Sequence, residues 1–206
     1  SRDGQARTRL LDAAVAVIRA RGLTGASVDD LCARAGVSKG AFFHHFPSKE
    51  ALAVAAAEHW SRTTGALFAA APYHAPADPL EKIMGYLDLR AALVQGTPAD
   101  YGCLAGTMAQ EVFDTSPAVR DACGASILGH AATLVPDIEG ALAAYRTDLD
   151  PAARSAHARS LAVHTQTVLQ GAFVSKAAND PTLVLDAIEH LRRYLRCVFT
   201  PTRSQP

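Results

Sequence analysis

The chain has 206 residues, 49 % of them hydrophobic, which suits one large domain or two small ones built of packed helices. No stretch approaches the roughly 18 consecutive apolar residues that a membrane span requires, and residues 1–9 lack the apolar segment of a signal peptide. The net charge is zero, but residues 1–50 carry +3 and residues 51–206 carry −3, so a basic segment suited to phosphates precedes an acidic body. The four cysteines form no C-x-x-C pair, which indicates free thiols. We therefore expect a cytoplasmic protein with no membrane partner.

The first 71 residues show helical spacing of apolar side chains, interrupted by glycine and proline. Ser27 and Asp30 stand three residues apart, as in a capping box, and Gly36 supplies a left-handed residue at the end of the helix that they begin. Ser38 and Ser48 are capping residues for the next two helices. The predicted helices are 7–21, 27–35, 38–46 and 48–71.

The rest of the chain marks its helix starts with a capping side chain followed by proline. The four instances are Asp78-Pro79, Ser116-Pro117, Asp150-Pro151 and Asp180-Pro181, and Glu81 would complete a capping box with Asp78. No segment alternates apolar and polar residues as a strand would, so the fold is predicted to be all-α with about nine helices. The further predicted helices are 79–95, 102–114, 117–145, with a possible bend near Pro136, 151–178 and 181–198.

Residues 27–46 have the form of a helix-turn-helix, in which the second helix enters the major groove of DNA. The small residues Gly40 and Ala41 allow a close approach to DNA, and Phe42 and Phe46 are expected to face the core. We predict a DNA-binding domain over residues 1–52. The candidate DNA contacts are Ser38, Lys39, Gly40, Ala41, Phe43, His44, His45 and Lys49.

Residues 7–54 resemble the DNA-binding domain of the TetR family of bacterial regulators. The resemblance rests on Ser27 to Leu31, Ala35 to Gly40 and Phe42 to Leu52. It implies that Ser27, Ser38, Lys39, Gly40, Phe43, His44 and Lys49 lie where family members touch DNA. Phe43 departs from the tyrosine that is usual there, and so lacks the hydroxyl that would donate to a phosphate, a contact of about 1 kcal/mol.

Residues from about 55 onward resemble the ligand-binding half of the same family, whose last two long helices usually form the dimer interface. The resemblance therefore implies a ligand-binding and dimerisation domain over residues 53–206. Here the two helices are 151–178 and 181–198, both with wide apolar faces, although burial within one subunit would give the same pattern. The stretch from Tyr101 to Glu111 resembles a subgroup with a G-C-L motif, in which the cysteine of some members is a sensing thiol. Cys103 would then be reactive and Lys176 could approach it; the alternative is a small buried cysteine and a solvated lysine.

Aromatic, polar and thiol side chains of this half are the candidate ligand contacts, and each of them is also compatible with a purely structural role. They are Trp60, Tyr86, Tyr101, Cys103, Met108, His130, His164, Phe173 and Lys176. His157 and His164 share a helical face without a third ligand, so no metal site and no cofactor is predicted.

The sequence thus predicts a ligand-responsive repressor that binds a near-palindromic DNA operator as a homodimer and releases it when a small-molecule inducer binds. A transcription activator of the same architecture, a thiol-based electrophile sensor through Cys103 and a dimer that has lost DNA binding are the alternatives. No catalytic motif such as G-x-S-x-G, H-E-x-x-H or a P-loop is present, so the chain is not expected to be an enzyme.

Overall fold

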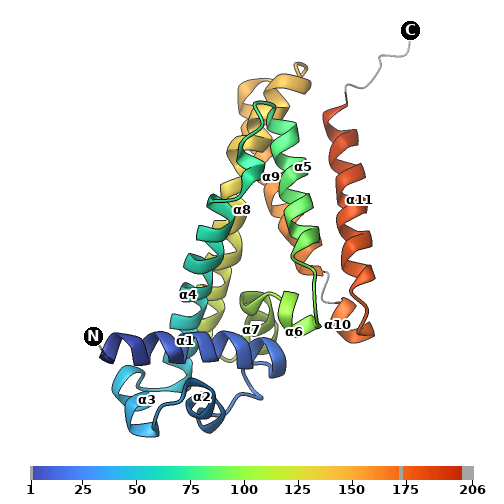
Figure 1. Ribbon diagram of the computed structural model, residues 1–206. Coiled ribbons are helices and arrows are strands. Elements are labelled where there is room, and N and C mark those ends of the chain that lie inside the picture. Colours follow the sequence, from blue (N-terminus) through green and yellow to red (C-terminus); the bar gives the residue numbers. More distant parts are fainter. Residues whose placement is uncertain (1, 172–173, 201–206) are drawn as a thin grey trace. The chain divides into compact units, whose positions relative to one another are not determined.

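The computed structural model describes residues 2–171 and 174–200, which form helices joined by short loops, with no strand in those ranges (Figure 1). The chain divides into two compact units. The first unit contains residues 2–69 and 98–127, and the second contains the described residues of 70–97 and 128–200. The prediction of an all-α fold with an N-terminal helix-turn-helix is confirmed.

The first unit is built around α1, which packs against α2, α3, α4, α6 and α7 (Figure 1). Its side chains form one continuous core to which the N-terminal helices, α4, α7 and the start of α8 all contribute, including Leu10, Phe42, Leu52, Met108 and Val119. The helices of this unit are α1 (Arg2–Arg21), α2 (Val28–Ala35), α3 (Lys39–His45), α4 (Lys49–Ala69), α6 (Pro98–Tyr101), α7 (Leu104–Val112) and the first part of α8 (Pro117–Tyr145).

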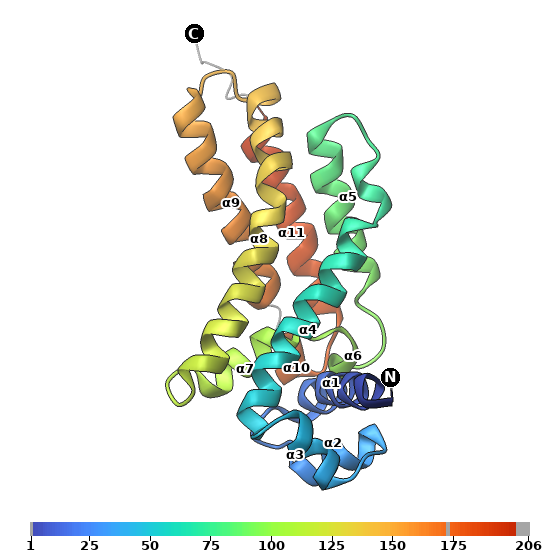
Figure 2. The same ribbon diagram turned by 90° about the vertical axis from the view of Figure 1, so that its left-hand side faces the viewer.

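The second unit contains α5 (Pro79–Ala92), the rest of α8, α9 (Pro151–Gly171), α10 (Val174–Ala178) and α11 (Thr182–Phe199), with a short 3-10 helix, η1 (Pro72–His74). The α11 helix packs against both α5 and α9 (Figure 2). It buries Val184, Ile188, Leu191, Leu195 and Phe199, which recur every three to four residues on one face. The helix is therefore held by a continuous apolar stripe.

The capping side chains act as predicted at most helix starts. Ser27 and Asp30 form a reciprocal capping box, and Ser38 Oγ accepts from the Ala41 amide. Ser48 Oγ accepts from the Ala51 amide at 3.0 Å, and Asp150 Oδ1 accepts from the Ala153 amide at 2.8 Å. The Asp78 carboxylate accepts from the Leu80 amide at 2.8 Å and also from the Glu81 amide, the acceptor role that a capping box requires.

Two predicted helices are interrupted. The predicted helix 102–114 begins only at Leu104, because Cys103 adopts an extended conformation as its N-cap, and the preceding loop contains the short helix α6. The predicted helix 151–178 ends as α9 at Gly171, and α10 begins at Val174. Pro136 lies within the continuous helix α8. In the described part of the chain no helix is long and apolar enough to cross a membrane.

Candidate nucleic-acid interface and ligand site

The helix-turn-helix rests on two phenylalanines that point into the first unit. Phe42 is fully buried and Phe46 is 3 % exposed, so both are core residues, as predicted. Gly36 ends α2 with φ 62°, and its amide donates to the carbonyls of Ala33 and Cys32. This left-handed residue turns the chain sharply enough to bring α3 against α2. The turn therefore fixes which side of α3 faces outward.

The outward side of α3 carries most of the predicted DNA contacts. Ser38, Lys39, Gly40, Phe43 and His44 are exposed, whereas Ala41 and His45 are half-buried. Phe43 leaves 53 % of its surface in solvent, an unusual position for a large apolar side chain. A helix that presents small, cationic and aromatic residues on one exposed side is suited to lie in a DNA groove.

Lys39 is held by an acid on the neighbouring helix. Its Nζ lies 2.8 Å from Asp29 Oδ1, and both side chains are more than half exposed. The hydrogen bond and the charge of Asp29 raise the pKa of Lys39, so the lysine stays cationic at neutral pH. An exposed ion pair of this kind is weak, and a phosphate can compete for the amino group.

Lys49 has a structural contact that the sequence did not reveal. Its Nζ donates to the carbonyls of Leu23 and Ala26 at 3.0 Å each, which ties the start of α4 to the loop between α1 and α2. Ser27, also predicted to touch DNA, is exposed but uses its hydroxyl in the capping box. Contacts from either residue to DNA remain predictions.

A buried polar cluster lies in the second unit. Tyr86 on α5 is 1 % exposed, and its hydroxyl lies 3.0 Å from His130 Nε2 on α8. Gln166 on α9, 3 % exposed, donates its amide to the same hydroxyl at 2.8 Å. Burial raises the pKa of Tyr86, and burial, with a smaller contribution from Arg90, lowers the pKa of His130 to about 4. Both groups are therefore neutral at pH 7.

Tyr86 and His130 were predicted ligand contacts, whereas Gln166 was not. A signal for Gln166 was present, because it interrupts the buried face of α9 formed by Ala158, Leu161, Ala162, Thr165 and Leu169. Buried polar groups that converge within a helical bundle are typical of ligand sites, although a satisfied network also specifies a core.

The other candidate ligand contacts divide between the two units. In the first unit Met108 is fully buried in the core, and the ring of Trp60 lies under Arg19. The hydroxyl of Tyr101 is buried and has no hydrogen-bond partner among the described residues. Cys103 is half-buried, and its Sγ accepts from the Gly106 amide at 3.4 Å.

In the second unit His164 does not join the buried cluster. It lies on the exposed side of α9, with its ring 5.1 Å from that of Tyr194. Lys176 lies half-buried on α10, and Phe173 falls outside the described residues. No group of three potential metal ligands occurs in the described ranges.

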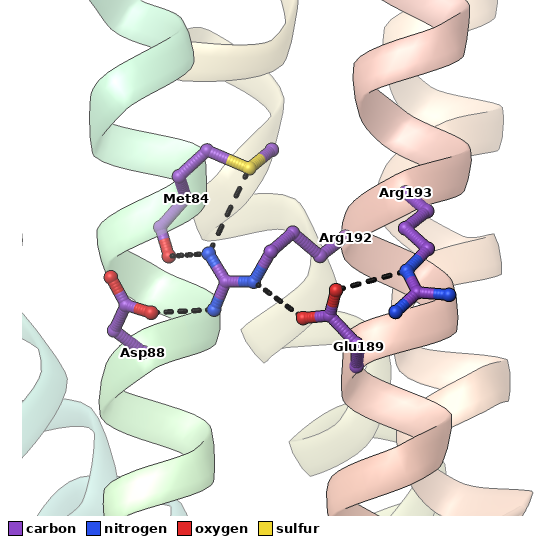
Figure 3. Close-up of polar contacts among 5 residues, drawn as sticks. All are labelled: Met84, Asp88, Glu189, Arg192 and Arg193. Atoms are coloured by element: carbon purple, nitrogen blue, oxygen red, sulfur yellow. Dashed lines mark hydrogen bonds and ion pairs between the residues drawn. The ribbon is translucent and has the colours of Figure 1, made fainter.

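The two helices predicted to form a dimer interface carry apolar groups on their outer sides. Leu183, Leu185 and Tyr194 on α11 and Val163 on α9 are each at least 37 % exposed. The α11 helix is also held by Arg192, whose guanidinium bonds Asp88 Oδ1 at 2.5 Å and Glu189 Oε2 at 3.3 Å (Figure 3). Its Nη1 also lies 3.5 Å from the Met84 carbonyl, so α11 is anchored to α5.

Comparison with known proteins agrees with this geometry. Residues 10–56 match the model of the family described as bacterial regulatory proteins, tetR family. The chain is 30 % identical over 114 residues, 55 % of its length, to the HTH-type transcriptional repressor DhaR of Mycobacterium sp. (strain GP1), and the match spans 56 % of that relative.

Solved structures extend the likeness to nearly the whole chain. A TetR transcriptional regulator from Chloroflexus aurantiacus J-10-FL is 25 % identical with a TM-score of 0.78, covering 95 % of this chain and 96 % of that one. The reduced form of E. coli NemR has the same fold, at 24 % identity and a TM-score of 0.71, over 91 % and 95 % of the two chains.

A capped recognition helix on a three-helix scaffold, followed by a second helical unit, defines the class of helix-turn-helix transcription regulators. Within that class, residues 10–56 match the tetR family, and the chain is similar over nearly its whole length to a TetR regulator of known structure.

Proposed function

We propose that the chain is a repressor that binds a near-palindromic DNA operator as a homodimer in the cytoplasm and releases it when a small molecule binds. The observation that carries this proposal is the exposed side of α3, with Ser38 capping the helix and Lys39 and Gly40 at its start. The curated relative named as a repressor favours repression over activation. The proposed role is binding rather than catalysis, in keeping with the family.

Dimerisation would supply the second recognition helix. The exposed apolar groups of α9 and α11 are the proposed interface, because a surface of this kind is stabilised when a second copy covers it. Two recognition helices about 34–36 Å apart would then read half-sites one DNA turn apart.

Selection from a random duplex library tests operator binding directly. We expect the selected sites to be two-fold symmetric, with half-site centres about 10 base pairs apart. Selected sites without symmetry would contradict the dimeric reading, and a failure to enrich any sequence would contradict specific DNA binding.

We infer that the effector binds at the cluster of Tyr86, His130 and Gln166. A ligand that binds one of two conformations more tightly by about 2.7 kcal/mol changes DNA affinity 100-fold. Disrupting buried hydrogen bonds such as those in this cluster changes the free energy by a similar amount. A small-molecule library would be screened for release of the selected operator. Tyr86→Phe should abolish release, whereas Tyr145→Phe, which removes a hydroxyl bound to Asp78 in the same unit, should not. Unchanged release from Tyr86→Phe would place the effector elsewhere.

Thiol sensing is a second candidate function, favoured by one observation. Cys103 is half-buried at the N-cap of α7, where its sulfur receives the Gly106 amide. We propose, as for some members of the subgroup with a G-C-L motif, that an electrophile would alkylate this sulfur and release the operator. Intact-protein mass spectrometry with Cys103→Ser tests this. Release of the variant by the same electrophile, or labelling confined to the exposed Cys197, would refute it.

A further inference from the structure

The last turn of α1 is hydrogen-bonded to the corner between α6 and α7. Arg19 Nε donates to the Gly102 carbonyl at 2.8 Å, and its Nη2 donates to the Asp100 carbonyl. The guanidinium carbon also lies 5.0 Å from the centroid of the Trp60 ring on α4. One side chain therefore joins three segments that are far apart in the sequence.

This contact involves a cation that is partly removed from water. Burial lowers the pKa of Arg19, which means that its surroundings disfavour the charge. An arginine cannot lose its proton in a protein, so the carbonyls and the indole ring must replace the lost water. The carbonyls that it binds come from the end of α6, where a helix leaves such groups without internal partners.

A second contact joins α7 to the turn that follows α1. Glu111 Oε2 on α7 accepts from the Thr24 amide at 2.9 Å. The carboxylate lies so close to the backbone that a Cβ built on Gly22 would be 1.9 Å from Glu111 Oε1. Gly22, which has no Cβ, therefore leaves room for the Glu111 carboxylate beside the turn that leads to α2.

Neither residue lies on the exposed side of α3, and both connect the helix-turn-helix to residues 98–112 of the same unit. We propose that Arg19 and Glu111 are positioning residues for operator binding, which set the DNA affinity by fixing the helix-turn-helix on the α6–α7 corner. The proposal rests on the operator binding proposed above. It implies that a displacement of Gly102, which Tyr101 and Cys103 flank, would reach α1 through the Arg19 hydrogen bonds.

Operator affinity of four full-length variants tests the proposal. We expect Arg19→Gln and Glu111→Ala to weaken binding to a selected operator by about tenfold, while binding to random DNA changes by less than about twofold. Glu111→Gln keeps an acceptor for the Thr24 amide and should remain within about twofold of the parent. Arg62→Gln removes an exposed arginine of α4 in the same unit and is the control for lost charge.

The salt dependence separates positioning from direct contact with DNA. Loss of a phosphate contact lowers the slope of log affinity against log salt by about 0.9, whereas loss of positioning leaves the slope unchanged. A lowered slope for Arg19→Gln, an equal loss on operator and random DNA, or unchanged affinity would each overturn the proposal. If the parent itself shows no operator preference, the proposed function fails. The contacts of Arg19 and Glu111 are then tested without DNA.

Hydrogen exchange of the free protein provides that test. In Glu111→Ala and Arg19→Gln we expect faster exchange throughout α1, α2 and α3, because the helix-turn-helix would open independently of α7. Arg62→Gln should exchange like the parent. An increase confined to residues 22–26 in Glu111→Ala would mean that the acid is only a local cap, and the proposal would be wrong.

Discussion

Gly22 is the residue at which backbone conformation and a side-chain contact constrain the sequence most tightly. It adopts φ 79°, which residues with a Cβ rarely do, and Glu111 occupies the space where that Cβ would lie. We expect Gly22→Ala to lower the free energy of unfolding by roughly 1–3 kcal/mol, as urea titration would measure. Gly65→Ala is the matched control: nothing lies within 4 Å of its Cβ position in α4, so it should stabilise by about 0.5–1 kcal/mol. Equal effects of the two changes would contradict this account.

Asp29 offers a way to change the charge next to the recognition helix without touching its exposed side. Asp29→Asn removes the ion-pair partner of Lys39, so that DNA phosphates no longer compete with a carboxylate for the lysine amino group. Binding to random DNA at low salt should become about threefold tighter, and the gain should shrink as salt rises. Glu58→Gln, which removes an exposed acid on α4, is the control for net charge. Unchanged or weaker binding of Asp29→Asn would show that the pair does not limit Lys39.

At the same scale, the sequence predicted which aromatic residues of α3 are buried, but it did not predict which groups the long charged side chains elsewhere would contact. The spacing of Phe42 and Phe46 predicted their burial, because a helical face follows from periodicity. It did not predict that Lys49 would turn inward, since the carbonyls of Leu23 and Ala26 become its acceptors only after folding. Arg19 and Gly102 are 83 residues apart, and no local pattern links them.

At the scale of the helices, capping chemistry predicted where most of them begin, because a cap is a local hydrogen bond between neighbouring residues. The four-residue helix α6 was missed, since so short a segment has no measurable periodicity. The start of α7 was placed too early because Cys103 is an unusual N-cap.

His130 makes α8 sensitive to acid. Its pKa in the folded protein, about 4, lies below its ordinary value of 6.5. Because the unfolded state takes up the proton first, the contribution of His130 to the free energy of unfolding is complete above pH 6.5 and is lost as the pH falls towards 4. From pH 7 to pH 5 its contribution to the free energy of unfolding should fall by about 2 kcal/mol. Urea titrations at both pH values should show a smaller acid loss for His130→Gln than for the parent. An equal loss in both proteins would mean that His130 titrates normally.

For the whole molecule, the exposed apolar groups of α9 and α11 predict association. Val163→Arg places a charge on the proposed interface and should shift the protein from dimer to monomer in sedimentation velocity. Operator affinity should fall with it, because one recognition helix would remain for each complex. Ala144→Arg, on an exposed position of α8, should leave the dimer intact. A Val163→Arg protein that stays dimeric would place the interface elsewhere.

The division of the chain was less predictable than its helices. The sequence predicted a boundary after residue 52, and that boundary stays a prediction. The core of the first unit nevertheless joins Leu10 and Phe42 to Leu104 and Val119, so the helix-turn-helix shares its core with later helices. Such long-range packing depends on which apolar faces meet, and the spacing within each helix does not determine this.

The central claim, that α3 reads a specific DNA site, is tested most directly by fluorescence anisotropy. The parent and Lys39→Ala would be titrated with a library-selected duplex and its scrambled counterpart at two salt concentrations. We predict tighter binding to the selected duplex, weakening with salt, and for Lys39→Ala weaker binding with a salt slope lower by about 0.9. Equal affinity for both duplexes at both salt concentrations, with no effect of Lys39→Ala, would contradict the claim.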